Sequence, residues 1–213
     1  MIKIIDFPKI QSPFIRVLNE KDEYVVTPEI NPGYEWVFTG DENEVFAVEK
    51  VNGTCCAILI ENGVVSAMFN RTNRIPFIGG TLSKALTEGV NNAFSQERFI
   101  MQDGLWWGEL IGPKINGNDF KLTEYEWLPF EWLRKSCTYK SFHKYPKTFE
   151  NIKQWMLGKI EDGGLFSLYM KRKGINQKPE GIVFHNIKTG EMCKLRLDMF
   201  EGFSGKRHKE DKL

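Results

Sequence analysis

Two pairs of apolar segments, each joined by a turn, are the clearest pattern along the chain. Residues 55–60 and 64–69 are apolar and flank Glu61-Asn62-Gly63. An Asn-Gly pair between two such segments is a strong signal for a β-hairpin. Residues 181–184 and 192–197 flank the turn residues Lys188-Thr189-Gly190 and predict a second hairpin near the end of the chain.

Two helical patterns lie between these hairpins. The pattern predicts one helix over Thr81–Ala93, capped by Thr81, and another over Thr148–Ile160. The second helix has one apolar face, formed by Phe149, Ile152, Met156 and Ile160. Strand pairs come first and last, and no regular alternation of strand and helix appears. The predicted class is therefore α+β, with mainly antiparallel sheets and flanking helices.

Length and composition are those of an ordinary water-soluble domain. The chain has 213 residues, of which 41% are hydrophobic and 27% charged. We expect one domain over residues 1–203 and a charged tail over residues 204–213. No apolar segment approaches the roughly 20 residues that a membrane helix needs, and the first residues are too charged for a signal peptide. The four cysteines and three histidines lack metal-ligand spacing, so we expect reduced cysteines in a cytoplasmic protein.

Charge is distributed unevenly although the net charge is only +1. Residues 1–133 carry 11 basic and 19 acidic side chains (11 − 19 = −8), and residues 134–213 carry 18 and 9 (18 − 9 = +9). One interpretation is a face that attracts a polyanion. The other is that charges from both halves interleave in three dimensions and cancel.

The segment Glu49-Lys50-Val51-Asn52-Gly53-Thr54 places a lysine between an apolar strand pattern and a glycine turn. A lysine fixed at a strand end can act as a nucleophile if its amine is neutral. The K-x-N-G string is weak evidence by itself, because most lysines near glycines are solvated turn residues.

Four more clusters follow Lys50. Arg71 comes just after the first hairpin, Glu109 ends an aromatic strand pattern before Gly112-Pro113, and Glu180 opens the strand pattern Gly181-Ile182-Val183. Lys194 and Arg196 are two residues apart and so lie on one face of a strand. Each has an ordinary explanation as a solvated rim residue. That explanation does not account for their order: K-x-N-G, Arg, G-E-L-x-G-P, E-G-I-V and K-L-R.

This order resembles the motifs of ATP-dependent RNA ligases, in the covalent nucleotidyltransferase superfamily of polynucleotide ligases and RNA-capping enzymes. The segments 49–56 and 108–118 look most similar to the ligases that seal 3′-OH/5′-phosphate nicks, and Phe7-Pro8-Lys9-Ile10 adds to the likeness. The resemblance covers nearly the whole chain. It implies a nucleotidyltransferase (ATP-grasp-like) domain.

The resemblance assigns the nucleophile to Lys50, which would attack the α-phosphorus of ATP and form lysyl-N-AMP. An unperturbed lysine has a pKa of about 10.4, so neutrality at pH ~7.5 requires a shift of roughly 3 units, or about 4 kcal/mol. Burial and the cations Lys194 and Arg196 act in that direction. The same two cations would stabilise charge on the α-phosphate.

The resemblance also implies the ligands of the nucleotide and of a divalent metal. Glu109 would bind the ribose hydroxyls, and Glu180 would help hold hydrated Mg²⁺ or Mn²⁺. Arg71 would contact the AMP phosphate or the RNA 5′-phosphate, and Trp127, preferred over Phe130, would stack on adenine. The remaining implied nucleotide ligands are Glu49, Val51 and Gly53, and the remaining implied metal ligands are Glu109 and Asn52.

The implied reaction has three steps with RNA as partner. After Lys50 is adenylylated, AMP passes to a 5′-phosphate and gives A(5′)pp(5′)N, and a 3′-OH then attacks and releases AMP. We expect a monomer without a membrane anchor. It would act in the cytoplasm, or in the cytoplasm of a host if a phage or virus encodes it. The basic C-terminal half would contact the RNA backbone.

Two departures from the family pattern affect these expectations. The motif usually reads K-x-D-G, and Asn52 replaces the acid with an amide, which carries no charge to offer a metal-bound water. We also expect no OB-fold or other appended module, and therefore a possible partner protein that would help to bind RNA. The alternatives are a DNA ligase, a GTP-using capping enzyme, and a non-catalytic RNA-binding module of the same fold.

Overall fold

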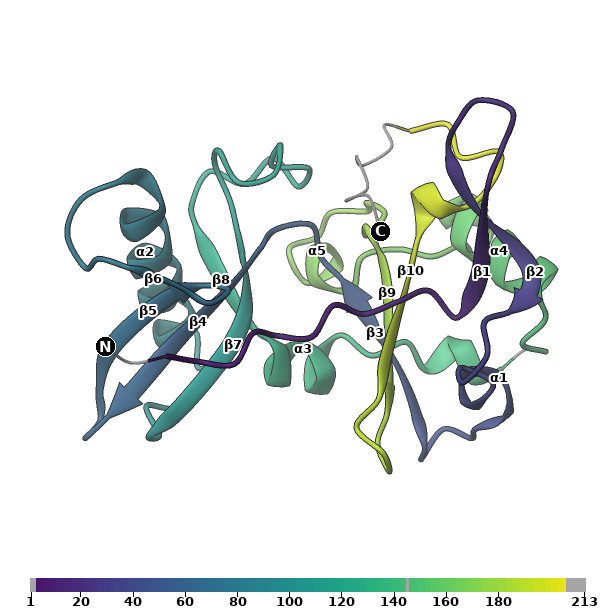
Figure 1. Cartoon of the computed structure of the whole chain (residues 1–213). Coiled ribbons are helices and arrows are strands. Elements are labelled where there is room, and N and C mark those ends of the chain that lie inside the picture. Colours follow the sequence, from purple (N-terminus) through teal and green to yellow (C-terminus); the bar gives the residue numbers. More distant parts are fainter. Residues whose placement is uncertain (1–2, 145, 206–213) are drawn as a thin grey trace. The chain divides into compact units, whose positions relative to one another are not determined.

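The computed structural model describes residues 3–144 and 146–205, which belong to two compact units (Figure 1). Of the described residues, the five-stranded unit comprises 3–9 and 51–136, and the three-stranded unit comprises 10–50, 137–144 and 146–205. The region expected as one domain thus contains two units, each with its own sheet. Of the predicted charged tail, residues 206–213 lie outside the described residues.

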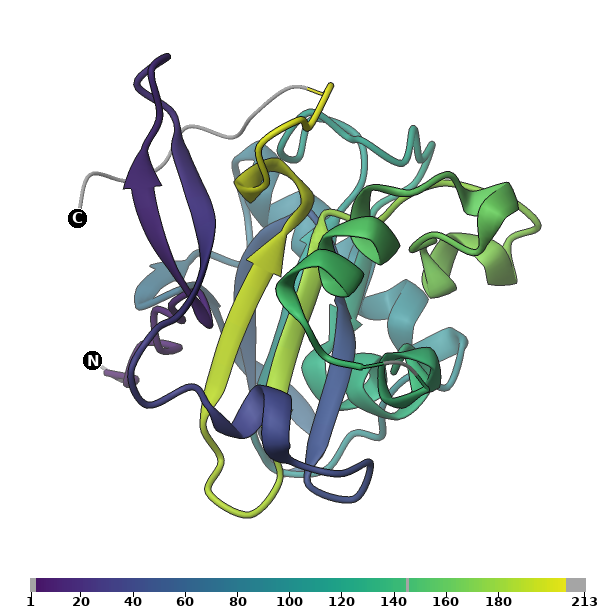
Figure 2. The same cartoon turned by 90° about the vertical axis from the view of Figure 1, so that its right-hand side faces the viewer.

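The three-stranded unit is built on the antiparallel sheet β10-β9-β3, whose strands lie side by side in Figure 2. These strands are Met192–Arg196, Gly181–Asn186 and Val45–Lys50. A separate ribbon pairs β1 (Phe14–Leu18) with β2 (Tyr24–Ile30). The helices are α1 (Trp36–Thr39), α4 (Phe149–Leu157), α5 (Leu168–Arg172) and the short 3₁₀ turns η1 (Lys140–His143), η2 (Ile160–Asp162) and η3 (Leu197–Met199).

One face of this sheet forms the core of the unit. Ala47, Ile182 and Leu195 are fully buried and alternate with residues that point the other way. They pack in one cluster with Ile152 and Met156 of α4. The residues on the opposite face include Lys50, Lys194 and Arg196.

The five-stranded unit contains the antiparallel sheet β6-β5-β4-β7-β8. Its strands are Asn73–Ile75, Val64–Asn70, Thr54–Glu61, Gly104–Ile111 and Glu126–Pro129, and its helices are α2 (Thr81–Ser95) and α3 (Phe130–Ser136). Helix α2 packs against β7 and β8 on one face of the sheet (Figure 1). Leu86 and Val90 of α2 join Ile58, Leu110 and Trp127 in the core of this unit.

The structure confirms the α+β class with antiparallel sheets and both predicted hairpins. The first hairpin turns at Asn62 and Gly63, whose φ values of 53° and 73° are those of a two-residue turn that matches the twist of the strands. No helix in the parts of the chain that the structure describes is long and apolar enough to cross a bilayer.

The two helix predictions differ in their details. Thr148 caps α4 by accepting a hydrogen bond from Asn151 N at 3.3 Å, but α4 ends at Leu157 because Gly158 leaves the helical conformation. The predicted cap at Thr81 is wrong. Gly80 takes the N-cap position with φ 81°, a conformation that favours glycine, and Thr81 is already inside α2.

Candidate active site

Strand register in the three-stranded unit brings Lys50, Lys194 and Arg196 to one face of the sheet. Lys50 of β3 and Arg196 of β10 both lie opposite Gly181 of β9. In the next row on the same face, Lys194 lies opposite Val183. Residues directly opposite each other, and those two positions along, share a face of a sheet. Three cationic side chains therefore emerge together, opposite the core.

Gly181 keeps the row between Lys50 and Arg196 open. A Cβ atom built at this position would lie 2.7 Å from the Cα of Arg196 and closer still to the carbonyl oxygen of Leu195. No side chain fits without moving β10. The glycine thus permits close strand pairing and leaves the space between the two cations free of a third side chain.

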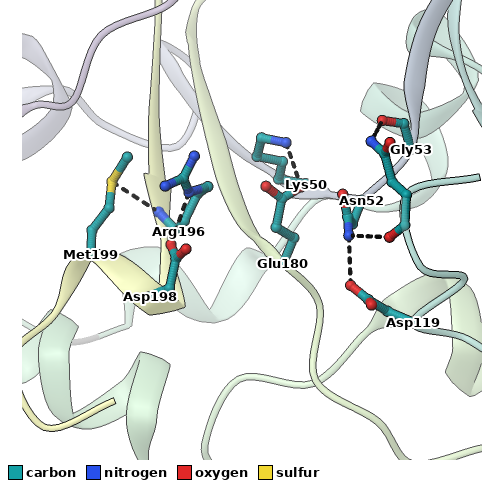
Figure 3. Close-up of polar contacts among 9 residues, drawn as sticks. Lys50, Asn52, Gly53, Asp119, Glu180, Arg196, Asp198 and Met199 are labelled. Carbon is teal, nitrogen blue, oxygen red and sulfur yellow. Dashed lines mark hydrogen bonds and ion pairs between the residues drawn. The ribbon is translucent and has the colours of Figure 1, made fainter. Parts of the chain in front are cut away.

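Glu180 forms an ion pair with Lys50 (Figure 3). Its Oε2 lies 2.5 Å from Lys50 Nζ, and the side chains are 7% and 21% exposed. The Glu180 backbone N–H also donates to the Lys50 carbonyl oxygen at 3.1 Å. A carboxylate at this distance favours the charged amine. In this arrangement the Lys50 amine is held in its charged form, which is not nucleophilic.

Asp198 orients the guanidinium of Arg196. Arg196 Nε donates to Asp198 Oδ1 at 2.8 Å, and the two side chains are 11% and 3% exposed (Figure 3). A guanidinium has five N–H donors in a rigid plane, so one bond fixes its orientation. The sequence analysis missed Asp198, although its place two residues after Arg196 could have indicated it.

Glu49 does not join this cationic face. Strand alternation points its side chain into the core, where it is 1% exposed. One carboxylate oxygen accepts a hydrogen bond from Tyr169 N at 2.9 Å, and the other accepts from Ser167 Oγ. The predicted role of Glu49 as a nucleotide ligand therefore disagrees with its position. Its contacts tie β3, next to Lys50, to the start of α5.

We expect the stability of the protein to depend on pH because Glu49 is buried. Burial raises the pKa of this carboxyl from 4.5 to about 7, although bonds from Ser167 and Tyr169 oppose the shift. The folded state thus binds more protons than the unfolded state between these values, and its stability falls as pH rises from about 4.5 to 7. The loss is about 3 kcal/mol when converted at about 1.4 kcal/mol per unit.

Glu49→Gln removes this ionisation and keeps a hydrogen-bonding side chain of the same shape. Urea unfolding at pH 5 and pH 8 should show the variant gaining up to about 3 kcal/mol relative to the unmodified protein at the higher pH. Two stability curves that stay parallel between these pH values would contradict the assignment.

Lys178 anchors the segment that leads to Glu180. Its Nζ donates to the carbonyl oxygens of Met156 at 2.8 Å, Gly158 at 2.7 Å and Leu165 at 3.2 Å. Desolvation by burial lowers the pKa of this amine. No local pattern indicates this role, because its three partners lie 13 to 22 residues away along the chain.

In the five-stranded unit, the K-x-N-G turn depends on Gly53. A Cβ at this position would lie 2.7 Å from Ile111 Cγ2 and closer to the Leu110 carbonyl oxygen. Val51 is 2% exposed and anchors the turn. Asn52 Nδ2 donates to Asp119 Oδ2 at 2.6 Å and to the Asn116 carbonyl oxygen at 3.2 Å (Figure 3). Asp119 was missed by the sequence analysis.

Glu109 lies on the sheet face opposite α2. It pairs with Cys55 of β4 and Leu128 of β8, and it is partly exposed. The neighbouring residues Cys56 and Leu110 point into the core beneath α2. Glu109 therefore lies on the outer face of the sheet, away from the core beneath α2.

Trp127 disagrees with its predicted role. It is 0% exposed, its ring contacts Phe99 edge-on at 5.4 Å, and its indole N–H lies 3.4 Å from the Cys56 carbonyl oxygen. A side chain enclosed in the core under α2 has no face on which adenine can stack. Phe130, the alternative, is partly exposed at the start of α3 and packs against Phe7 at 4.8 Å between ring centroids.

Arg71 is held by the first residues of the chain. Its Nε and Nη2 donate to Asp6 Oδ2 at 3.0 and 2.9 Å, and Nη2 also donates to the Phe7 carbonyl oxygen at 2.9 Å. Both charged side chains are more than a third exposed. A phosphate that binds Arg71 would have to compete with Asp6.

The predicted metal ligands do not form a preassembled cage. Within residues 3–144 and 146–205, no three His, Cys, Asp or Glu side chains are grouped so that they could hold an ion. Mg²⁺ often keeps its waters and takes one or two carboxylates together with substrate phosphates. Glu180 and Glu109 each fit that limited role, and Asn52 offers only a neutral amide.

Comparison with known proteins gives similarities of structure alone. No family model and no curated protein matches the sequence. The chain is similar to a structure of Naegleria gruberi RNA ligase with PPi, at 18% identity over 72% of this chain and 49% of that chain, with a TM-score of 0.45. Two variants of that ligase with ATP and Mn are 14% and 15% identical, cover 90% and 91% of this chain and 60% and 61% of theirs, and give TM-scores of 0.49 and 0.48. This chain thus spans about half to three fifths of the length of those structures.

Proposed function

We propose that this protein is an ATP-dependent RNA ligase, or its adenylyltransferase portion, which forms a covalent lysyl-AMP intermediate on Lys50. The observation that carries the proposal is the face of the three-stranded sheet where Lys50 emerges with Lys194 and Arg196, next to Glu180. A binding surface alone does not require an amine at a strand end that is paired with a nearly buried carboxylate.

In the first step, the neutral Lys50 amine attacks the α-phosphorus of ATP. A P–N bond forms, the bond from the α-phosphorus to the bridging oxygen breaks, pyrophosphate leaves and the amine proton passes to solvent. Lys194 and Arg196 stabilise the negative charge that develops on the α-phosphate. Both are fixed by strand β10, and Asp198 orients the guanidinium.

A divalent metal fits the donor set as a companion of the nucleotide. Bound Mg²⁺ or Mn²⁺ would neutralise phosphate charge and orient the leaving group. Glu180 would hold its waters, and this would also remove the carboxylate from Lys50 and favour the neutral amine. Glu109 would accept hydrogen bonds from the ribose hydroxyls, and Phe130 replaces Trp127 as the aromatic residue proposed to stack on adenine.

In the later steps, AMP passes from Lys50 to the 5′-phosphate of RNA, and a 3′-OH displaces it. Arg71 would contact the 5′-phosphate after it exchanges its ion pair with Asp6. The alternatives remain a DNA ligase and a GTP-using capping enzyme of the same superfamily, which share the first step. They differ in the base of the nucleotide and in the strand that is joined.

The protein should become labelled when it is incubated with ATP carrying ³²P at the α-position and with Mg²⁺ or Mn²⁺. A P–N bond to lysine predicts a label that is lost in acid and survives in alkali. Labelling from GTP instead of ATP would favour the capping alternative, and joining of DNA but not RNA strands would favour a DNA ligase. Absence of any label on the folded protein would leave only an RNA-binding module.

A further inference from the structure

Asn52 and Asp119 form a pair that links the K-x-N-G turn to a loop far along the sequence. The amide nitrogen of Asn52 lies 2.6 Å from Asp119 Oδ2 and 3.2 Å from the Asn116 carbonyl oxygen (Figure 3). Both partners can only accept hydrogen bonds, so the nitrogen of the amide must be the atom that faces them. The Asn52 oxygen therefore points away from Asp119.

The loop that presents Asp119 is held in an unusual conformation. Lys114, Asn116, Asn118 and Lys121 all have positive φ between 40° and 64°. Non-glycine residues adopt such angles only where other contacts fix them. Asn118 supplies two, since its side chain accepts from Leu122 N at 2.9 Å and donates to Leu122 O at 2.8 Å.

A second contact joins the loop to the turn from the opposite direction. The Asn116 side chain donates to the Gly53 carbonyl oxygen, while its own carbonyl oxygen accepts from Asn52. Two consecutive residues of the turn are thus bound by the same loop. This reciprocal arrangement fixes the carboxylate of Asp119 beside Asn52 instead of leaving it on a freely moving loop.

The pair also explains why position 52 carries an amide. An aspartate there would place a second carboxylate 2.6 Å from Asp119, and two carboxylates at that distance cannot both ionise without a large penalty. An amide donates instead, and the shared site keeps a single negative charge. The hydrogen bond from Asn52 does not itself remove that charge from Asp119.

We infer that Asp119 supplies the negative charge that the K-x-N-G turn lacks, and that Asn52 is the positioning residue that holds it there. The ligand of this carboxylate is the hydrated divalent cation that accompanies ATP. The inference rests on the proposed function, because that function brings the metal and nucleotide to Lys50, two residues before Asn52. A hard carboxylate oxygen suits such a cation or its waters, whereas an amide adds no charge.

The experiment exchanges the two side chains. Asp119→Asn removes the charge and leaves an amide pair that can still share a hydrogen bond, so the fold should be retained. Asn52→Asp with Asp119→Asn reverses the members of the amide–carboxylate pair, with loss of the hydrogen bond from residue 52 to the Asn116 carbonyl oxygen. Glu124→Gln is the control, since it removes one exposed charge from the same unit.

Mn²⁺ binding is measured by electron paramagnetic resonance of the free ion, with α,β-methylene ATP as a nucleotide that cannot transfer AMP. Asp119→Asn should weaken nucleotide-dependent Mn²⁺ binding about tenfold or more, as expected for loss of a charged ligand contact. The double exchange should return it to within about threefold of the unmodified protein, and Glu124→Gln should match the unmodified protein.

Unchanged Mn²⁺ binding in Asp119→Asn would overturn the inference, as would a double exchange no better than the single variant. An unmodified protein that binds no Mn²⁺ in the presence of the nucleotide would overturn it too. Failure of the proposed function gives a different result: Mn²⁺ and the analogue bind and depend on Asp119, but α-labelled ATP never labels Lys50.

Discussion

Lys50→Ala should abolish covalent labelling by α-labelled ATP, with a loss of at least about 1,000-fold, because the residue provides the atom that bonds to phosphorus. Nucleotide binding should persist, since Lys194 and Arg196 remain on the same face of the sheet. The measurement is radioactivity on the denatured protein after incubation with ATP and Mg²⁺ or Mn²⁺.

The control for this prediction separates chemistry from stability. Alanine leaves Glu180, 7% exposed, without the amine that now lies 2.5 Å away, and that can destabilise the unit. Lys50→Arg keeps a cation for Glu180, but a guanidinium stays protonated at all accessible pH values and cannot attack. We therefore expect a folded and unlabelled Lys50→Arg protein. Label on either variant at the normal rate would exclude Lys50 as the nucleophile.

Lys194→Ala should lower the rate of labelling by about 100-fold or more, the usual effect of removing a group aimed at developing charge. Lys194 lies two residues before Arg196 on β10, on the same sheet face as Lys50 and opposite the core. Loss of its charge should weaken both the stabilisation of the α-phosphate and the tendency of Lys50 to lose its proton.

Lys188→Ala offers a matched control for Lys194→Ala. Lys188 lies in the turn of the same β9–β10 hairpin, exposed and paired with Glu44. The Lys188→Ala protein should be labelled at the normal rate. A surface ion pair contributes little to stability, and the turn lies at the end of β9 and β10 that is far from Gly181 and Arg196. Equal rates for Lys194→Ala and Lys188→Ala would show that Lys194 does not act on the phosphate.

Local sequence predicted those parts of the fold that depend on residues near one another in the chain. Asn62-Gly63 permits the positive φ values of its turn, and the Thr148 hydroxyl accepts a hydrogen bond from Asn151 N in the first turn of α4. Thr81 shows the limit of this reasoning. Gly80, one residue earlier, adopts the N-cap conformation at lower steric cost, so the side-chain cap is not used.

Individual site roles were harder to predict because they depend on which face of an element is covered. Glu49 and Lys50 are neighbours in a motif, yet strand alternation sends one into the core and the other out of it. Trp127 was predicted to stack on adenine because it is aromatic and lies in a predicted strand. Helix α2 packs over β8 and buries Trp127 completely, and the residues around Trp127 in the sequence do not indicate this packing.

The sequence by itself determined the α+β class, the two hairpins, and the spacing that puts Lys194 and Arg196 on one face, because these follow from turn chemistry and the two-residue period of a strand. Only the tertiary structure decided that Glu180 pairs with Lys50, 130 residues away, and that Asp119 pairs with Asn52, 67 residues away. Such contacts depend on strand register and loop conformation in three dimensions. No local pattern of residues specifies either one.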